Sequence, residues 1–312
     1  MALLMFKNLV VYRLSGLGGE PWGATLTEVE DGLSKARFVP CMATQPLSAG
    51  WVSPRHGEGG EGGTAPLVES IGGQWLMRLM VEQKVLPSAV VKRRVEELAK
   101  KSEQATGRKP GKRHAKELKE EAVLALLPQA FTKQASVNVW MDTKAQLLMI
   151  DASSAKRAEE AATMLVQSLE GLALRLVQTT LSPAAAMTAW LAGGEPPSAF
   201  SVDRECELKS ADEMKSVVRY ARHPLDTEEV RAHVLSGGKQ PTRLALTWKG
   251  RVSFVLTDTL QIKKLSVDDG LFDAGSSRAD EGFDADAAIA TGELRQLIPD
   301  LVAALDGELA TA

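Results

Sequence analysis

The chain has 312 residues, a formal net charge of −3, 44% hydrophobic residues and 25% charged residues. This composition is typical of a folded globular protein and excludes a wholly disordered chain or a membrane bundle. The length allows two or three packed units or one extended body, because single hydrophobic cores stop growing near ~250–300 residues.

Neither an exported nor a membrane protein is predicted. No run of about 18 uninterrupted apolar residues occurs, and the apolar start at residues 1–14 is interrupted by Lys7 and Asn8, which argues against a signal peptide. Cys41 and Cys206 lie far apart and share no spacing that suits zinc or a redox pair. We expect reduced structural thiols and a cytoplasmic location.

The first part of the chain, residues 1–86, is predicted to be an N-terminal α/β part. Residues 3–14 and 75–86 are rich in Leu, Val and Met and are typical of partly buried strands. Between them, residues 53–66 are dominated by glycine, which costs too much backbone entropy for a regular element and predicts an exposed loop.

Residues 87–131 are predicted to form a basic helical hairpin. Apolar residues recur at helical spacing at Val91, Val95 and Leu98, while lysines and arginines occupy the other faces. Gly107, Pro110 and Gly111 break the pattern before a second helical stretch over about 112–127. The tip of the hairpin therefore carries the densest cluster of cations.

The rest of the chain is predicted to be sheet and helix. Residues 132–198 contain two strands (136–142 and 146–151), a helix (154–169) and a strand (172–178), a β-β-α-β unit. In residues 199–312 we expect strands at 200–209, 217–222, 243–248, 251–257 and 261–266, with helices at 226–235 and 284–309. The predicted fold class is α+β with mostly antiparallel sheets.

Charge is distributed unevenly along the chain. Residues 92–119 hold eleven Lys and Arg against four Glu, a local balance of +7. From residue 268 to the end there are eleven acids against two Arg, a balance of −9. We expect one charged surface of each sign.

The sequence predicts no cofactor site, no metal site and no catalytic residue. Gly57, Gly59 and Gly62 have the G-x-G-x-x-G spacing, but no strand precedes them and no long helix follows, so a flexible loop is the better interpretation. The four histidines have no metal-binding spacing. The acid pairs Asp268–Asp269 and Asp284–Asp286 are more typical of helix caps or turns than of cation sites.

The basic segment has two interpretations. Lysines and arginines that neutralise phosphates release condensed counterions, which gives affinity for nucleic acid without reading bases. The alternative is a solvated helical face, in which Glu96, Glu97, Glu103 and Glu117 pair with several of the cations at helical spacing. Composition alone leaves the two open.

A resemblance to a known family bears on this choice. Nearly the whole chain resembles the RdgC family of bacterial recombination-associated proteins. The segments that carry the resemblance occur in the family's order: MFKNL (5–9), VYRL (11–14), KVLPS (84–88), LLPQAF (126–131), WMDT (140–143), DASSAK (151–156), LALTW (244–248), FDAD (283–286) and TGEL (291–294).

The resemblance implies a homodimer closed into a ring, with double-stranded DNA passing through a positively charged hole and no preference for base sequence. It also implies that the protein restrains RecA-dependent recombination and is associated with the nucleoid. We expect that the protein is not an enzyme. Single-stranded DNA is a further partner to test.

The resemblance also assigns roles to residues. It implies DNA contacts at Arg108 and Lys109, with Lys112 close by, and near Arg222 and His223. A further basic position of the family is Gln129 here, which removes one charge. Together with the basic segment, the predicted DNA-binding residues are Lys92, Arg93, Arg108, Lys109, Lys112, Arg113, Lys116 and Arg222.

Phe131 matches a family aromatic that packs across one of the two subunit contacts, although a Phe after Pro128 is also compatible with an ordinary core position. Two rival functions remain. One is a protein-interaction module that binds RecA directly through the acidic C-terminal region, DNA being incidental. The other is a nuclease that uses the acid pairs.

Overall fold

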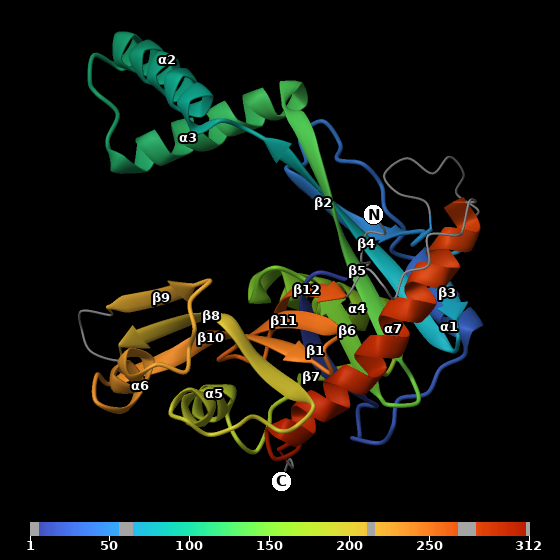
Figure 1. The fold of residues 1–312 in the computed structure, drawn as a ribbon. Coiled ribbons are helices and arrows are strands. Elements are labelled where there is room, and N and C mark those ends of the chain that lie inside the picture. The colour runs from blue at the N-terminus through green and yellow to red at the C-terminus, as the bar shows by residue number, and fades with distance from the viewer. Residues whose placement is uncertain (1–5, 56–64, 211–215, 268–278, 310–312) are drawn as a thin grey trace.

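The computed structural model describes residues 6–55, 65–210, 216–267 and 279–309. Within these residues the chain forms one large antiparallel sheet, helices that cover its two faces, and an arm of two helices that projects from the body (Figure 1). The fold class is α+β. A single continuous sheet replaces the several sheets that the sequence suggested.

The sheet has twelve strands in the described residues. In chain order these are β1 (Leu9–Ser15), β2 (Leu47–Val52), β3 (Val68–Ile71), β4 (Gln74–Val85), β5 (Phe131–Asp142), β6 (Leu147–Asp151), β7 (Ala173–Leu176), β8 (Phe200–Ser210), β9 (Val217–Ala221), β10 (Lys239–Trp248), β11 (Val252–Thr257) and β12 (Ile262–Val267). Along the main path of the sheet the order is β2-β4-β5-β6-β1-β12-β11-β10-β8-β9, with β3 paired to β4 and β7 to β1.

The helices are placed between these strands. They are α1 (Leu26–Ser34), α2 (Ser88–Thr106), α3 (Lys112–Leu126), α4 (Ala155–Ser168), α5 (Pro183–Leu191), α6 (Glu228–Leu235) and α7 (Ala279–Ala304), with a short 3₁₀ turn η1 (Leu127–Gln129). Helices α2 and α3 form the arm, and the other helices pack on the body (Figure 1).

Two hydrophobic cores lie on opposite faces of the central strands. Because side chains alternate along a strand, β1 contributes to both cores: Leu9 and Val11 face one and Val10, Tyr12 and Leu14 face the other. The second core contains α1 and α4, and the first contains α5, α6 and α7. The central strands are therefore buried on both sides.

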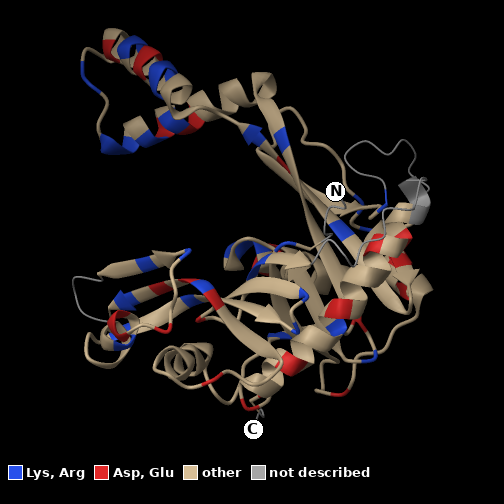
Figure 2. Cartoon of the chain, in the orientation of Figure 1, with Lys and Arg blue, Asp and Glu red and all other residues tan. Residues whose placement is uncertain are grey.

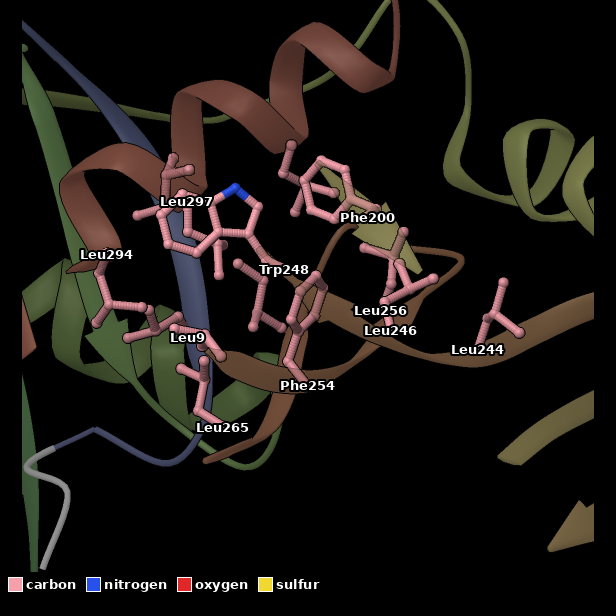
Figure 3. Packing of buried hydrophobic residues seen from close by; sticks show 14 of the residues in the cluster. Leu9, Phe200, Leu244, Leu246, Trp248, Phe254, Leu256, Leu265, Leu294 and Leu297 are labelled. Atoms are coloured by element: carbon pink, nitrogen blue, oxygen red, sulfur yellow. The ribbon is translucent and has the colours of Figure 1, made fainter. Parts of the chain in front are cut away.

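Trp248 is the centre of the first core. Its ring is fully buried and lies beside Leu294 and Leu297 of α7, with Phe254 and Leu9 close by (Figure 3). Its Nε1 donates a hydrogen bond to Asp300 Oδ2 at 2.9 Å, and Lys249 Nζ lies 3.1 Å from the same carboxylate oxygen. These contacts fasten the long C-terminal helix to β10.

The expected elements are largely found, with shifted boundaries. The strand expected over 75–86 is β4, and the β-β-α-β unit is β5, β6, α4 and β7. The C-terminal strands are β8 to β12 in the expected order. The strand expected over 3–14 begins only at Leu9 among described residues, and most of the glycine-rich loop 53–66 lies outside the described residues.

Several elements were missed or misplaced. Residues 15–74 contain α1, β2 and β3, and residues 183–191 form α5, none of which the sequence predicted. Asp284 lies inside α7 rather than at a helix cap, while Asp268 and Asp269 are outside the described residues. The division into segments 1–86, 87–131, 132–198 and 199–312 stays a prediction.

Both cysteines are free thiols. Cys206 is buried in β8, and desolvation raises its pKa to about 11. Cys41 is partly exposed, and desolvation followed by its contacts with Glu82 raises the pKa of its thiol as well. Both thiols are therefore protonated at neutral pH, as expected of structural cysteines.

Asp300 gives a pH-dependent test of how α7 is held. The hydrogen bond from Trp248, and then Lys249, lowers the pKa of Asp300, so its contribution to stability is present above the unfolded pKa of about 4 and is lost as the pH falls through the folded pKa. We expect Asp300→Asn to lower the unfolding free energy at pH 7 by about 1 kcal/mol, because the carboxylate is partly exposed.

The measurement is urea denaturation of wild type and variant between pH 7 and pH 3. The difference between the two proteins should shrink below about pH 4. Asp258→Asn, at an exposed aspartate after β11, is the control and should behave as wild type. A difference that stays constant with pH would contradict the assignment.

Candidate nucleic-acid interface

The arm is carried by two long strands. β4 and β5 are paired without interruption from Trp75–Met141 to Val85–Phe131, eleven residue pairs in all. The chain leaves β4 at Val85, passes Pro87 at the N-cap of α2, and returns from α3 through η1 into β5. The direction of the arm is therefore set by the strands of the core (Figure 1).

The tip of the arm is a glycine turn. Gly107 ends α2 in the left-handed conformation with φ 69°, which a residue with a Cβ adopts at a cost. Its N–H donates to Glu103 O at 2.8 Å, and Thr106 Oγ1 donates to Ser102 O at 2.7 Å. Arg108 and Lys109 follow directly and are exposed.

The arm has little tertiary support. Helix α2 has no buried residue, and α3 buries only Leu118 and Ala122. Lys112 and Arg113 are in the first turn of α3, where Gly111 is the N-cap and no side chain caps the helix. Cations at a helix N-terminus oppose the helix dipole. A local arrangement that disfavours the helix is typical of a functional site.

Most cations of the arm are free of ion pairs. The described residues of the arm contain four ion pairs, Arg94–Glu97, Arg113–Glu117, His114–Glu117 and Lys116–Glu120, all between neighbours on one helix. The cations for which no carboxylate oxygen of the described residues lies within 4 Å are Lys92, Arg93, Lys100, Lys101, Arg108, Lys109, Lys112 and Lys119.

The glutamates therefore neutralise a minority of the positive charge. Glu96 and Glu103 pair with none of the cations among the described residues. The pairs that do form are exposed, and exposed pairs stabilise by only about 0–1 kcal/mol. They are easily exchanged for phosphates. Figure 2 shows the lysines and arginines spread over both helices and the tip of the arm.

The structure separates the predicted DNA-binding residues into two groups. Lys92, Arg93, Arg108, Lys109, Lys112, Arg113 and Lys116 are exposed on the arm. Arg222 is exposed just after β9, at the far end of the sheet, in the left-handed conformation with φ 57°. The arm and the end of the sheet around β9 extend to the same side of the body (Figure 1).

Phe131 is not a core residue. It is the first residue of β5, and 87% of its surface is exposed, more than any other large hydrophobic residue among those described. Gln129, the position at which the family resemblance implied a basic residue, is also exposed, in η1. The interpretation of Phe131 as an ordinary buried aromatic is therefore wrong.

An apolar groove lies near the base of the arm. It has a volume of about 580 Å³, and its apolar lining comes from Pro46 in the loop before β2 and from Val123, Leu124 and Leu127. The polar and charged residues that also line it are Thr44, Lys116, Lys119 and Glu120. Leu124 is 56% exposed, and Val85, the partner of Phe131 in the sheet, is also exposed. Exposed apolar residues gathered in this way mark interaction surfaces.

Sequence reasoning missed this groove, although a signal was present. Residues 123–127 are five consecutive apolar residues, VLALL, which is more than a helix with one buried face requires. Pro46 comes from a distant part of the chain, and no pattern in the sequence places it beside α3.

Among the described residues, no group of three or more His, Cys, Asp or Glu side chains is arranged to hold a metal ion. Asp284 is paired with Arg55 at 2.7 Å. None of the helices in the described ranges is long and apolar enough to cross a bilayer.

The fold and the arm define a class: an α+β protein built on one antiparallel sheet, from which a basic helical arm projects. Comparison with known proteins gives the family. Residues 4–308 match the family model described as "RdgC: Putative exonuclease, RdgC".

Curated relatives match over almost their entire length. The chain is 45% identical over 315 residues to the recombination-associated protein RdgC of Dechloromonas aromatica, covering 99% of this chain and 100% of the relative. It is 43% identical to that of Cupriavidus necator and 40% identical to that of Bordetella pertussis, each over 98% of this chain and 99% of the relative. The chain belongs to the RdgC family.

Proposed function

We propose that the protein binds double-stranded DNA without sequence preference, as a ring-shaped homodimer that encircles the duplex, and thereby restrains RecA-dependent recombination in the nucleoid. The observation that carries the proposal is the arm with its eight cations that lack a carboxylate partner among the described residues. No catalysis is required for this function.

The chemistry of the arm suits a phosphate backbone. Its cations are exposed, come from both helices and the tip, and sit on long flexible side chains. Such side chains contact phosphates over several base pairs and gain affinity from counterion release. The arm offers few side chains that read base edges well, since asparagine is absent from residues 88–126 and glutamine occurs once, at Gln104.

The homodimer is supported by Phe131 and the groove beside α3. An exposed aromatic and an apolar groove of about 580 Å³ near the same end of β5 form a self-complementary pair. A two-fold axis repeats each contact, so Phe131 of one subunit fills the partner's groove while the partner does the same. Buried aromatics of this kind dominate interface energetics.

The link to RecA and to the nucleoid rests on family membership. The matched relatives carry the name recombination-associated protein. A protein that occupies duplex DNA without sequence preference competes with any other protein that needs the same DNA. Restraint of RecA then follows from occupancy of DNA and needs no direct contact.

The rival function, direct binding of RecA through the acidic C-terminal region, finds less support. Acidic side chains there are already used within the chain: Asp284 pairs with Arg55, Glu293 with Arg251, Asp300 with Lys249, and Glu308 with Arg13 and Arg175. A complex with RecA that forms in the absence of DNA would favour this rival.

Replacing Arg108, Lys109, Lys112 and Arg113 by Ala should weaken binding to all duplexes alike. Each phosphate that the variant no longer neutralises should reduce the slope of log K against log salt by ~0.9. The measurement is fluorescence anisotropy with two unrelated duplexes of equal length across a salt series. The matched control removes four cations of the body, at Lys35, Lys144, Lys156 and Arg157. Equal effects of the two variants would refute the assignment to the arm.

Phe131→Ala should loosen one subunit contact by about 2 kcal/mol or more, because the side chain is a central aromatic anchor. Sedimentation velocity over a dilution series measures the dimer, and the rate of release from covalently closed circular DNA measures ring opening. Circular dichroism should show an unchanged subunit fold, since the side chain is exposed. Leu17→Ala, at a residue that is 81% exposed, is the control. A variant with unaltered dimer stability and release rate would exclude this role.

The description of the family model calls for a nuclease test. We expect the purified protein to leave end-labelled single and double strands intact during incubation with magnesium or manganese. Cleavage that disappears on chelation, and that persists in a preparation of the variant with Asn at both acid pairs, Asp268–Asp269 and Asp284–Asp286, would indicate a contaminant. Cleavage that this variant loses would overturn the non-enzymatic function.

A further inference from the structure

A second cavity lies in the body, away from the arm. It has a volume of about 780 Å³ and is lined by the end of α5, the loop into β8, the first part of β8, the loop before α6, and Arg231 of α6. Trp190, Leu191, Val202 and Leu225 supply its apolar walls. This size is within the range of pockets for small ligands.

Charged side chains of both signs line this cavity without pairing. They are Glu195, Asp203, Asp226, Arg204 and Arg231, and among the described residues no ion pair within 4 Å joins any of them. Asp203 accepts a hydrogen bond from Thr247 Oγ1 at 2.9 Å. Opposite charges that are kept apart around a cavity are available to a ligand that has both donors and acceptors.

Arg231 gives the second, independent observation. Its Nε is buried and has no hydrogen-bond partner in the described structure. A buried donor without a partner destabilises the folded chain, while the Arg231 side chain as a whole is only partly buried and lines the cavity, so a ligand in the cavity can contact it. Charge-assisted hydrogen bonds from a guanidinium to a phosphate or carboxylate are stronger than hydrogen bonds between neutral groups.

Gly193 lies beside this guanidinium in the loop after α5. It has φ 111°, a conformation that favours glycine, and a Cβ there would be in ordinary van der Waals contact with Arg231 Nε at 3.7 Å. A Cβ on Gly194 would instead approach Ala189 O of α5 to 2.8 Å, so glycine is needed there by the end of the helix and not by the cavity. Residue 193 therefore leaves the space beside Arg231 without a side chain.

We propose that this cavity binds a nucleoside monophosphate. The phosphate is held by Arg231 and Arg204, and the hydroxyl and amine donors of the ligand face the carboxylates of Asp226 and Glu195. The ring of Trp190 supplies a flat apolar surface for the base. A free amino acid offers the same two charges but is much smaller than the cavity, and a purely acidic ligand would meet three carboxylates.

The proposal does not depend on DNA binding by the arm, because the arm contributes no residue to the cavity. A free nucleotide and the nucleotide at the 5′ end of a DNA strand share the same chemistry. Binding of the mononucleotides and of a 5′-phosphorylated trinucleotide distinguishes these two sources, since the second requires tighter binding of the trinucleotide.

The test combines thermal denaturation with isothermal titration calorimetry. The probes are adenosine 5′-monophosphate and the four deoxynucleoside 5′-monophosphates. We expect at least one of them to bind the wild type and raise its Tm. Arg231→Met should weaken this binding at least about tenfold, as expected for removal of a charge-assisted hydrogen bond.

The same variant separates a ligand site from a structural role. Met removes an unpaired buried donor, so the Tm of Arg231→Met without ligand should equal or exceed that of wild type. Arg204→Met, at an exposed position, should also weaken binding. Arg157→Met on α4 is the matched control and should bind as wild type does.

Three results would overturn the proposal. The first is absence of binding by any of these nucleotides at millimolar concentration, and the second is tighter binding of glutamate or arginine than of the nucleotides. The third is a lowered Tm in Arg231→Met with nucleotide affinity unchanged, which would make the arginine a packing residue. The arm variants described above leave all these measurements unaffected, so failure of one proposal does not decide the other.

Discussion

The pairing of β4 with β5 is the constraint on which the rest of the structure depends. Eleven residue pairs join the two strands from the core to Val85 and Phe131. At one end, Trp140 and Met141 are buried in the two cores, and at the other Phe131 is exposed beside the helical arm. Because a shift of one residue would reverse every side chain, the buried residues fix the register. They thereby fix where the arm and Phe131 are presented.

The body and the arm differ in how their charged side chains are paired. In the body, carboxylates of the C-terminal region are paired with cations of the strands and their turns, as in Asp300 with Lys249 and Glu293 with Arg251. On the arm, most cations have no partner among the described residues. The small net charge of −3 therefore does not reveal that the arm carries a dense group of cations without carboxylate partners among the described residues.

The sequence predicted those helices and strands whose signal lies in a local pattern of residues. The helices at 88–106 and 112–126 follow from apolar spacing and from Gly107 and Pro110, and the strands after residue 199 follow from alternation. It missed α1, β2, β3 and α5: α5 has nearly uniform apolar composition, PAAAMTAWL, and shows no face. The family resemblance assigned Phe131 to a subunit contact. The exposure of its side chain and the groove that contains Pro46 depend on tertiary contacts, which the sequence does not show. The cavity at Arg231 is formed by separate segments between residues 190 and 231 that only the tertiary fold brings together, so no local pattern predicted it.

The absence of buried residues in α2 has a consequence for the effect of salt. A helix without tertiary support is held mainly by its own sequence, and on α2 opposite charges stand at attractive spacing, as in the pair Arg94–Glu97 and at Glu97 and Lys101. Added salt screens this attraction and weakens the helix, and the same salt competes with phosphates. Ionic strength thus acts in the same direction on the order of α2 and on the affinity of the arm for a polyanion: both fall as salt rises.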